Sequence, residues 1–240
     1  MAKAKRLCAA LFLASTLAGC ATSGGNPADP LEPLNRVVFS FNDTADKAVI
    51  KPVARAYRAV LPGIVRTGVS NFFSNLEDIW ISVNDVLQGK FQQGVESFTR
   101  VLFNSTFGVA GVFDFASDVG LQKHNEDFGQ TLGWWGVGSG AYLVLPILGP
   151  STIRDGFGLL LDTRADLVFY IDGVPVHNSL YGTRAISNRA NLLDASSIID
   201  QAALDKYAFV RDAWLQRRRN LVYDGNPPRE REDPDDEPTK

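Results

Sequence analysis

Residues 199–214, IDQAALDKYAFVRDAW, carry the pattern that decides the fold class. Apolar side chains recur in this stretch at intervals of four, four, three and four residues, at Ile199, Ala203, Tyr207, Val210 and Trp214. Polar side chains occupy the opposite side. This period is typical of an amphipathic α-helix, so we predict one helix through the stretch.

Other parts of the chain repeat the helical period. A second apolar stripe follows the helix breaker Gly89 and consists of Phe91, Val95, Phe98 and Leu102. Residues 35–51 and 70–87 also favour helices, and prolines and glycines separate them from their neighbours. Because no stretch alternates apolar and polar residues over several strands, we predict an all-α body of about eight short helices.

Residues 133–150, GWWGVGSGAYLVLPILGP, depart from this pattern. Gly136, Gly138 and Gly140 permit backbone conformations that are closed to other residues, and Pro146 interrupts the apolar run. A loose match to a dinucleotide-binding glycine pattern lacks the strand and helix that this motif requires. The composition fits a buried loop. It also fits an apolar hairpin at a membrane interface, where tryptophan and tyrosine side chains such as Tyr142 are enriched.

Residues 1–20, MAKAKRLCAALFLASTLAGC, have the layout of a secretory signal peptide, with basic residues, then an apolar run, then small residues. The final LAGC resembles a bacterial lipobox, in which the cysteine receives lipid before cleavage leaves it as the first residue. An ordinary signal peptide with a chance cysteine is the alternative. We predict a signal peptide at 1–19 and a lipid anchor on Cys20, and Ala21 after it favours the outer membrane.

The predicted mature chain has a helical body between two extended ends. Residues 20–33 are rich in Gly, Ser and Pro, which indicates a flexible tether. Residues 226–240 contain four prolines, six acidic residues and no large apolar residue, which predicts a disordered acidic tail. The helical domain is therefore placed at 34–225. It contains no apolar run of about 18 residues, so we expect no ordinary transmembrane helix.

Charge and motifs exclude several classes of function. The chain has 24 Lys and Arg against 27 Asp and Glu, so it lacks the excess of basic residues that is typical of nucleic-acid binding. It contains neither a GxSxG nor an HExxH motif, and His124 and His177 lack metal-ligand spacing. We predict no catalysis, no metal and no cofactor. Arg154 either pairs with the adjacent Asp155 or contacts a lipid phosphate.

Several motifs occur in one order between Asp29 and Gly225. They are DPLEPLNR at 29–36, FSFN at 39–42, NFFSNL at 71–76, NSTFG at 104–108, DFGQTLG at 127–133 and GPSTIRD at 149–155. Together they resemble the MlaA/VacJ family of outer-membrane lipoproteins. The chain departs from the family pattern at Ala141, where proline is usual, and at Asp78-Ile79, where an acidic residue is commonly followed by proline.

The resemblance implies a ring of amphipathic helices that lies in the outer membrane around a polar channel. It also implies that the protein takes phospholipid from the outer leaflet and passes it to a soluble periplasmic carrier, with a trimeric porin as companion. From the motifs and the glycine-rich segment we assign to the lipid pathway Phe39, Phe41, Asn42, Gly136, Gly138, Gly140, Tyr142, Pro146 and Arg154. We further predict that the 133–150 hairpin moves during transport. A structural tether and a lipid-modifying enzyme are the alternative functions.

Overall fold

The computed structural model describes residues 26–228. The predicted signal peptide, the lipid anchor on Cys20, the first part of the tether and most of the acidic tail lie outside the described residues. The prediction of these segments therefore stays a prediction.

The first arm of the fold is a nearly continuous helical rod. It consists of α2 (Glu32–Ala45), the π-helical turn η1 (Asp46–Ile50) and α3 (Lys51–Val60). Pro33 lies in the first turn of α2, where its fixed φ suits a helix start. Pro52 lies at the start of α3 and lacks the N–H group that a regular α-helix would use. The wider π turn directly before Pro52 accommodates this missing hydrogen bond.

An antiparallel helix pair follows, formed by α4 (Gly63–Leu87) and α5 (Phe91–Thr106). The turn between them passes through Gly89, whose φ of +76° is a conformation that glycine adopts without steric cost. The apolar stripe predicted for α5 faces outward, since Phe91 and Val95 are each 66% exposed. The buried side of α5 instead carries polar residues, among them Ser97, Arg100 and Asn104.

A short segment then leads to a β-hairpin. It contains α6 (Phe115–Asp118) and α7 (Phe128–Trp134), followed by β1 (Tyr142–Leu145) and β2 (Gly149–Thr152). The strands pair antiparallel, with Tyr142 opposite Thr152 and Leu145 opposite Gly149. The Asp127 side chain accepts a hydrogen bond from the Gln130 amide and so caps α7.

The remaining elements close the ring. They are α8 (Ile153–Ala165), the 3₁₀ turn η2 (Leu167–Tyr170), α9 (Val174–Asn191), α10 (Leu193–Ala202) and α11 (Lys206–Val222). The prediction of one helix through 199–214 is wrong, because Ala203 adopts an extended conformation and Asp205 caps a new helix by accepting a hydrogen bond from the Ala208 amide. A good capping residue within an apolar stripe therefore starts a second helix here.

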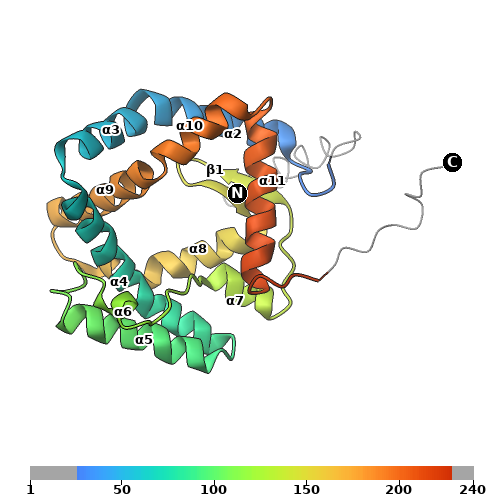
Figure 1. The fold of residues 1–240 in the computed structure, drawn as a ribbon. Coiled ribbons are helices and arrows are strands. Elements are labelled where there is room, and N and C mark those ends of the chain that lie inside the picture. The colour runs from blue at the N-terminus through green and yellow to red at the C-terminus, as the bar shows by residue number, and fades with distance from the viewer. Residues whose placement is uncertain (1–25, 229–240) are drawn as a thin grey trace, which may run out of the picture.

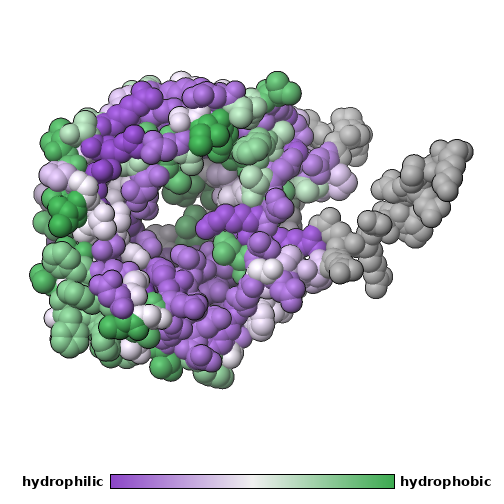
Figure 2. Space-filling view, viewed as in Figure 1, coloured by the Kyte–Doolittle hydropathy of each residue, from purple (hydrophilic) through white to green (hydrophobic). Residues whose placement is uncertain are grey.

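The helices surround a central opening (Figure 1). In the space-filling view this opening passes into the molecule and hydrophilic residues line much of its rim, whereas hydrophobic residues gather along the left outer edge (Figure 2). The all-α prediction and the ring with its hairpin are confirmed. Within residues 26–228, no helix combines the length and the hydropathy that crossing a membrane requires.

Candidate functional site

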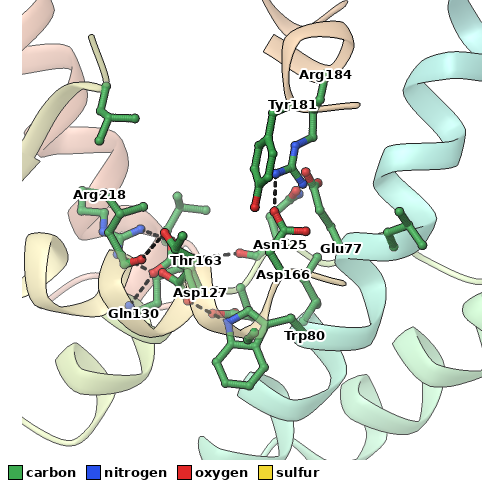
Figure 3. A pocket seen from close by; sticks show the side chains of 18 of the residues that line it. Glu77, Trp80, Asn125, Asp127, Gln130, Thr163, Asp166, Tyr181, Arg184 and Arg218 are labelled. Carbon is green, nitrogen blue, oxygen red and sulfur yellow. Dashed lines mark hydrogen bonds and ion pairs between the residues drawn. The ribbon is translucent and has the colours of Figure 1, made fainter. Parts of the chain in front are cut away.

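A cavity of about 600 Å³ lies where α4, α7, α8, α9 and α11 meet (Figure 3). Its lining includes five carboxylates and three arginines, together with aromatic and aliphatic residues. Charged groups at such density are unusual in a protein interior, because each must be hydrated or paired. The cavity therefore brings charged and apolar side chains together inside the ring, and α4 and α8 also carry exposed apolar side chains such as Val83 and Leu160.

One wall of the cavity is fixed by Arg218 of α11. Its Nη2 donates to Asp127 Oδ1 at 2.6 Å and to Asp155 Oδ1 at 2.8 Å. Burial favours the neutral form of Asp127, but the Arg218 guanidinium outweighs it and holds the pKa of Asp127 below its ordinary value. Arg154 donates to the same Asp155 oxygen at 3.0 Å through Nε. This ion-pair network ties α7, α8 and α11 together.

Glycines allow these helices to approach closely. A Cβ atom at Gly158 of α8 would lie 2.5 Å from the backbone nitrogen of Gly129 in α7. A Cβ atom at Gly129 would lie 2.4 Å from Nη2 of Arg218. A side chain at Gly158 would push α8 away from the backbone of α7, and a side chain at Gly129 would displace the Arg218 guanidinium from its place beside Asp127.

The opposite wall belongs to α4, which presents Glu77 and Trp80 to the cavity (Figure 3). Trp80 Nε1 donates to Asp162 Oδ1 of α8 at 2.7 Å, and the Phe128 amide donates to the same oxygen at 2.9 Å. Glu77 differs from the other carboxylates, because within the described residues it forms neither a hydrogen bond nor an ion pair. Burial raises the pKa of Glu77, and the positive charges of Lys123 and Arg184 oppose that rise.

Helix α9 contributes Arg184, which pairs with Asp166 at the C-terminal end of α8. The Arg184 guanidinium also lies 5.0 Å from the centre of the Tyr181 ring. Both residues of the pair line the cavity. The pair leaves no net charge there and links α8 to α9 across one end of the cavity.

The FSFN motif contacts the hairpin rather than this cavity. Phe39 packs edge to face on Tyr207 with ring centroids 5.5 Å apart, whereas Phe41 is 56% exposed. Asn42 clamps the hairpin turn, since its Nδ2 donates to the Leu145 carbonyl at 2.9 Å and its Oδ1 accepts from the Ile147 amide at 2.8 Å. None of the three lines the cavity.

The glycine-rich segment is only partly a hairpin. Gly136 and Gly140 have φ of +88° and +67° in the loop between α7 and β1, where Gly138 also lies. Pro146 begins the exposed turn between the strands. The interpretation of Tyr142 as an interface anchor is wrong, because its ring is fully buried against Tyr207 and Trp214.

The main wall residues were not predicted from the sequence. None of Glu77, Trp80, Asp162 and Arg218 is among the residues that the motifs assign to the lipid pathway. A signal was present in α4, where Glu77 and Trp80 stand three residues apart and therefore on one helix face. Of the predicted site residues, Arg154 lies closest to the wall network, through its pair with Asp155.

The two histidines lie outside the cavity lining. Between residues 26 and 228, no three or more His, Cys, Asp or Glu side chains are placed to hold a metal ion. His124 pairs with Glu96 at 3.2 Å, and the His177 ring lies against Tyr181 in a tilted arrangement with ring centroids 4.8 Å apart. The arrangement suits binding and passage of a polar group.

Comparison with known proteins agrees with this geometry. The family model described as "MlaA lipoprotein" matches residues 27–221. A protein of Escherichia coli K12, named intermembrane phospholipid transport system lipoprotein MlaA, is 38% identical over 224 residues, or 90% of this chain and 88% of the relative. A Haemophilus influenzae protein of the same name is 32% identical over 232 residues, or 93% of this chain and 92% of that relative.

A solved structure is also similar. It is described as "Structural basis for maintenance of bacterial outer membrane lipid asymmetry" and superposes with a TM-score of 0.71 at 35% identity, covering 81% of this chain and 98% of that chain. The motifs, the ring and the family model therefore agree, and the chain belongs to the MlaA lipoprotein family.

Proposed function

We propose that this protein removes phospholipid from the outer leaflet of the bacterial outer membrane and passes it through the central cavity to a periplasmic carrier. The observation that carries the proposal is the distribution of polarity, with apolar side chains outside and charged side chains around the cavity. A headgroup that crosses hydrocarbon loses its hydration, at a cost of several kcal/mol. A polar cavity within an apolar ring removes much of that cost while the acyl chains stay beside apolar surface.

The names of the similar proteins support this proposal. The E. coli and H. influenzae relatives are intermembrane phospholipid transport lipoproteins, and the similar solved structure concerns outer-membrane lipid asymmetry. Transfer of an intact lipid requires no covalent step, so the protein acts as a transporter rather than an enzyme.

We infer the location and the partners from the lipobox and from the family resemblance. A lipid anchor on Cys20 holds the protein in the outer membrane of the Gram-negative envelope, where a trimeric porin accompanies it and a soluble periplasmic carrier receives the lipid. Stable anchoring requires more than one acyl chain, and a processed lipoprotein supplies them. Mass spectrometry of the Cys20→Ser variant tests the anchor, and normal acylation of that variant would refute it.

Obstruction of the cavity tests the pathway. Thr163 of α8 lines the cavity, and its hydroxyl donates to the Leu159 carbonyl at 2.7 Å. Thr99 of α5 makes the same type of bond, to the Val95 carbonyl at 2.7 Å, without lining the cavity. Thr163→Trp should stop phospholipid transfer from vesicles to the purified carrier, whereas Thr99→Trp should retain it.

Equal transfer by the two tryptophan variants would contradict the proposed pathway. The same assay separates the alternatives. A structural tether leaves outer-leaflet phospholipid unchanged when the protein is lost from cells, and a lipid-modifying enzyme releases fatty acid from the vesicles.

A further inference from the structure

Glu77 is the one acidic residue of the cavity lining without a partner among the described residues. The other four acids are engaged, as Asp127 with Arg218, Asp166 with Arg184, Glu126 with Lys90 and Asp162 with the indole of Trp80. The surrounding helices partly desolvate Glu77, but its side chain stays accessible to solvent where it lines the cavity, so its carboxylate meets the space inside the ring. An unpaired carboxylate in this position is available to a ligand.

The nearest cations do not neutralise Glu77. Lys123 donates to Asp78 and to the Ser74 carbonyl, and Arg184 is paired with Asp166. Glu77 therefore adds a negative charge that no direct ion pair compensates, in a lining that holds five carboxylates and three arginines. A concave surface with an excess of one sign of charge attracts groups of the opposite charge.

Trp80 adds a second feature that suits a cation. It stands three residues after Glu77, on the same side of α4, and both residues line the cavity (Figure 3). Its indole N–H is held by Asp162, which fixes the orientation of the ring. Tryptophan is the aromatic side chain that attracts ammonium groups most strongly.

We propose that Glu77 makes the cavity selective for phospholipids whose headgroup carries an ammonium group, in preference to anionic phospholipids. This inference rests on the proposed transport function and names its substrate class. The ammonium group of the lipid headgroup pairs with the carboxylate of Glu77 beside the Trp80 ring. The phosphate is common to both lipid classes, so its contacts with arginines such as Arg217, which also lines the cavity, cannot distinguish them.

The test uses the full-length lipidated protein in detergent micelles that contain equal amounts of phosphatidylethanolamine and phosphatidylglycerol. The protein is purified again, and mass spectrometry measures the retained amount of each lipid. The natural protein should be enriched in phosphatidylethanolamine. Glu77→Gln should lower this enrichment about fivefold, as expected for loss of one partly hydrated charge pair, and Glu77→Lys should favour phosphatidylglycerol.

The matched control removes a carboxylate outside the cavity. Asp118 is exposed on α6 and does not line the cavity, so Asp118→Asn should leave the ratio unchanged. An unaltered ratio in Glu77→Gln, or a natural protein that retains the two lipids in micelle proportions, overturns the selectivity and leaves the transport function standing. A natural protein that retains no phospholipid overturns both.

Discussion

Arg100 shows at the scale of one residue how this protein replaces an apolar core with polar contacts. Its guanidinium is 2% exposed. It donates to Asp114 at 2.9 Å through Nη2, to the Leu121 carbonyl at 2.7 Å through Nη1 and to Asp78 at 3.3 Å through Nε. Because the apolar side of α5 faces outward, such contacts stabilise the packing of α4, α5 and α6.

Replacement of Arg100 should therefore be strongly destabilising. Arg100→Leu leaves the buried carboxylate of Asp78 with only Lys123, and loss of one partner of a buried ion pair costs about 3–5 kcal/mol. Arg100→Lys keeps the charge but loses the planar fork, so we expect a smaller loss. Denaturant unfolding followed by circular dichroism measures both. If Arg100→Leu has the same free energy of unfolding as the wild-type protein, this network does not stabilise the fold.

At the scale of elements, the start of α11 depends on a contact that the sequence pattern does not contain. Asp205 caps α11 and also pairs with Arg36 of α2, with Arg36 Nη2 at 2.7 Å from Asp205 Oδ2. The period of three and four residues through 199–214 predicts helix correctly on both sides. It cannot locate the break, because the partner that fixes Asp205 lies 169 residues earlier.

The Arg36–Asp205 contact predicts a pH dependence. Arg36, with help from the Ala208 amide, lowers the pKa of Asp205 to about 2. The charged form is favoured in the folded state, so this contribution to stability is complete above the ordinary pKa of about 3.9 and is lost as the pH falls through about 2. Arg36→Gln should raise the pKa of Asp205, as measured by NMR titration of its carboxyl carbon. Arg55→Gln, which removes an exposed cation elsewhere, should leave it unchanged.

Two asparagines of α2, about two helical turns apart, hold the β-hairpin to this helix. Asn35 accepts from the Val144 amide at 2.9 Å and donates to the Tyr142 carbonyl at 2.9 Å. Asn42 holds the turn itself, through Leu145 and Ile147. The sequence predicted a mobile hairpin from its glycines. The structure identifies the hydrogen bonds of Asn35 and Asn42 as the contacts that must break before the hairpin can move.

Loss of the outer clamp should loosen the turn without unfolding the hairpin. In Asn42→Ala, the Leu145 carbonyl and the Ile147 amide lose their partners, whereas Asn35 still holds the strand. We expect faster hydrogen exchange at the Ile147 amide and, if the hairpin controls passage, altered outer-leaflet phospholipid in cells. Phe41→Ala is the control, because Phe41 is exposed beside Asn42. Identical exchange in both variants would show that Asn42 does not restrain the turn.

At the scale of the whole molecule, periodicity predicted helices but not the direction in which they face. The stripe of α5 has the same spacing whether it covers a core or contacts lipid, so only the motif resemblance indicated a ring in a membrane. The wall of the cavity was harder to predict. It is assembled from Glu77, Asp127, Asp162 and Arg218, which come from four separate segments, and no local pattern relates them.

The outward apolar face of α5 leads to a prediction that would not hold for a helical protein that stays in water. Val95 and Leu102 of α5 are 66% and 51% exposed, so glutamates at these positions should cost little folding stability in detergent. In a bilayer each charge costs about 2.5–3.5 kcal/mol if it lies at hydrocarbon depth. The Val95→Glu, Leu102→Glu double variant should therefore float poorly with vesicles made of phospholipid alone.

The control for this variant adds charge to the same helix on a polar surface. Gln92 lines a polar groove together with Glu96 and His124, so Gln92→Glu should float as well as the natural protein. The comparison is made with chains that lack residues 1–20, because the acyl chains and the apolar signal segment would otherwise mask a weak interaction of the body. Equal flotation of the double variant and the control would mean that α5 does not enter the hydrocarbon, and its exposed stripe would then face another protein.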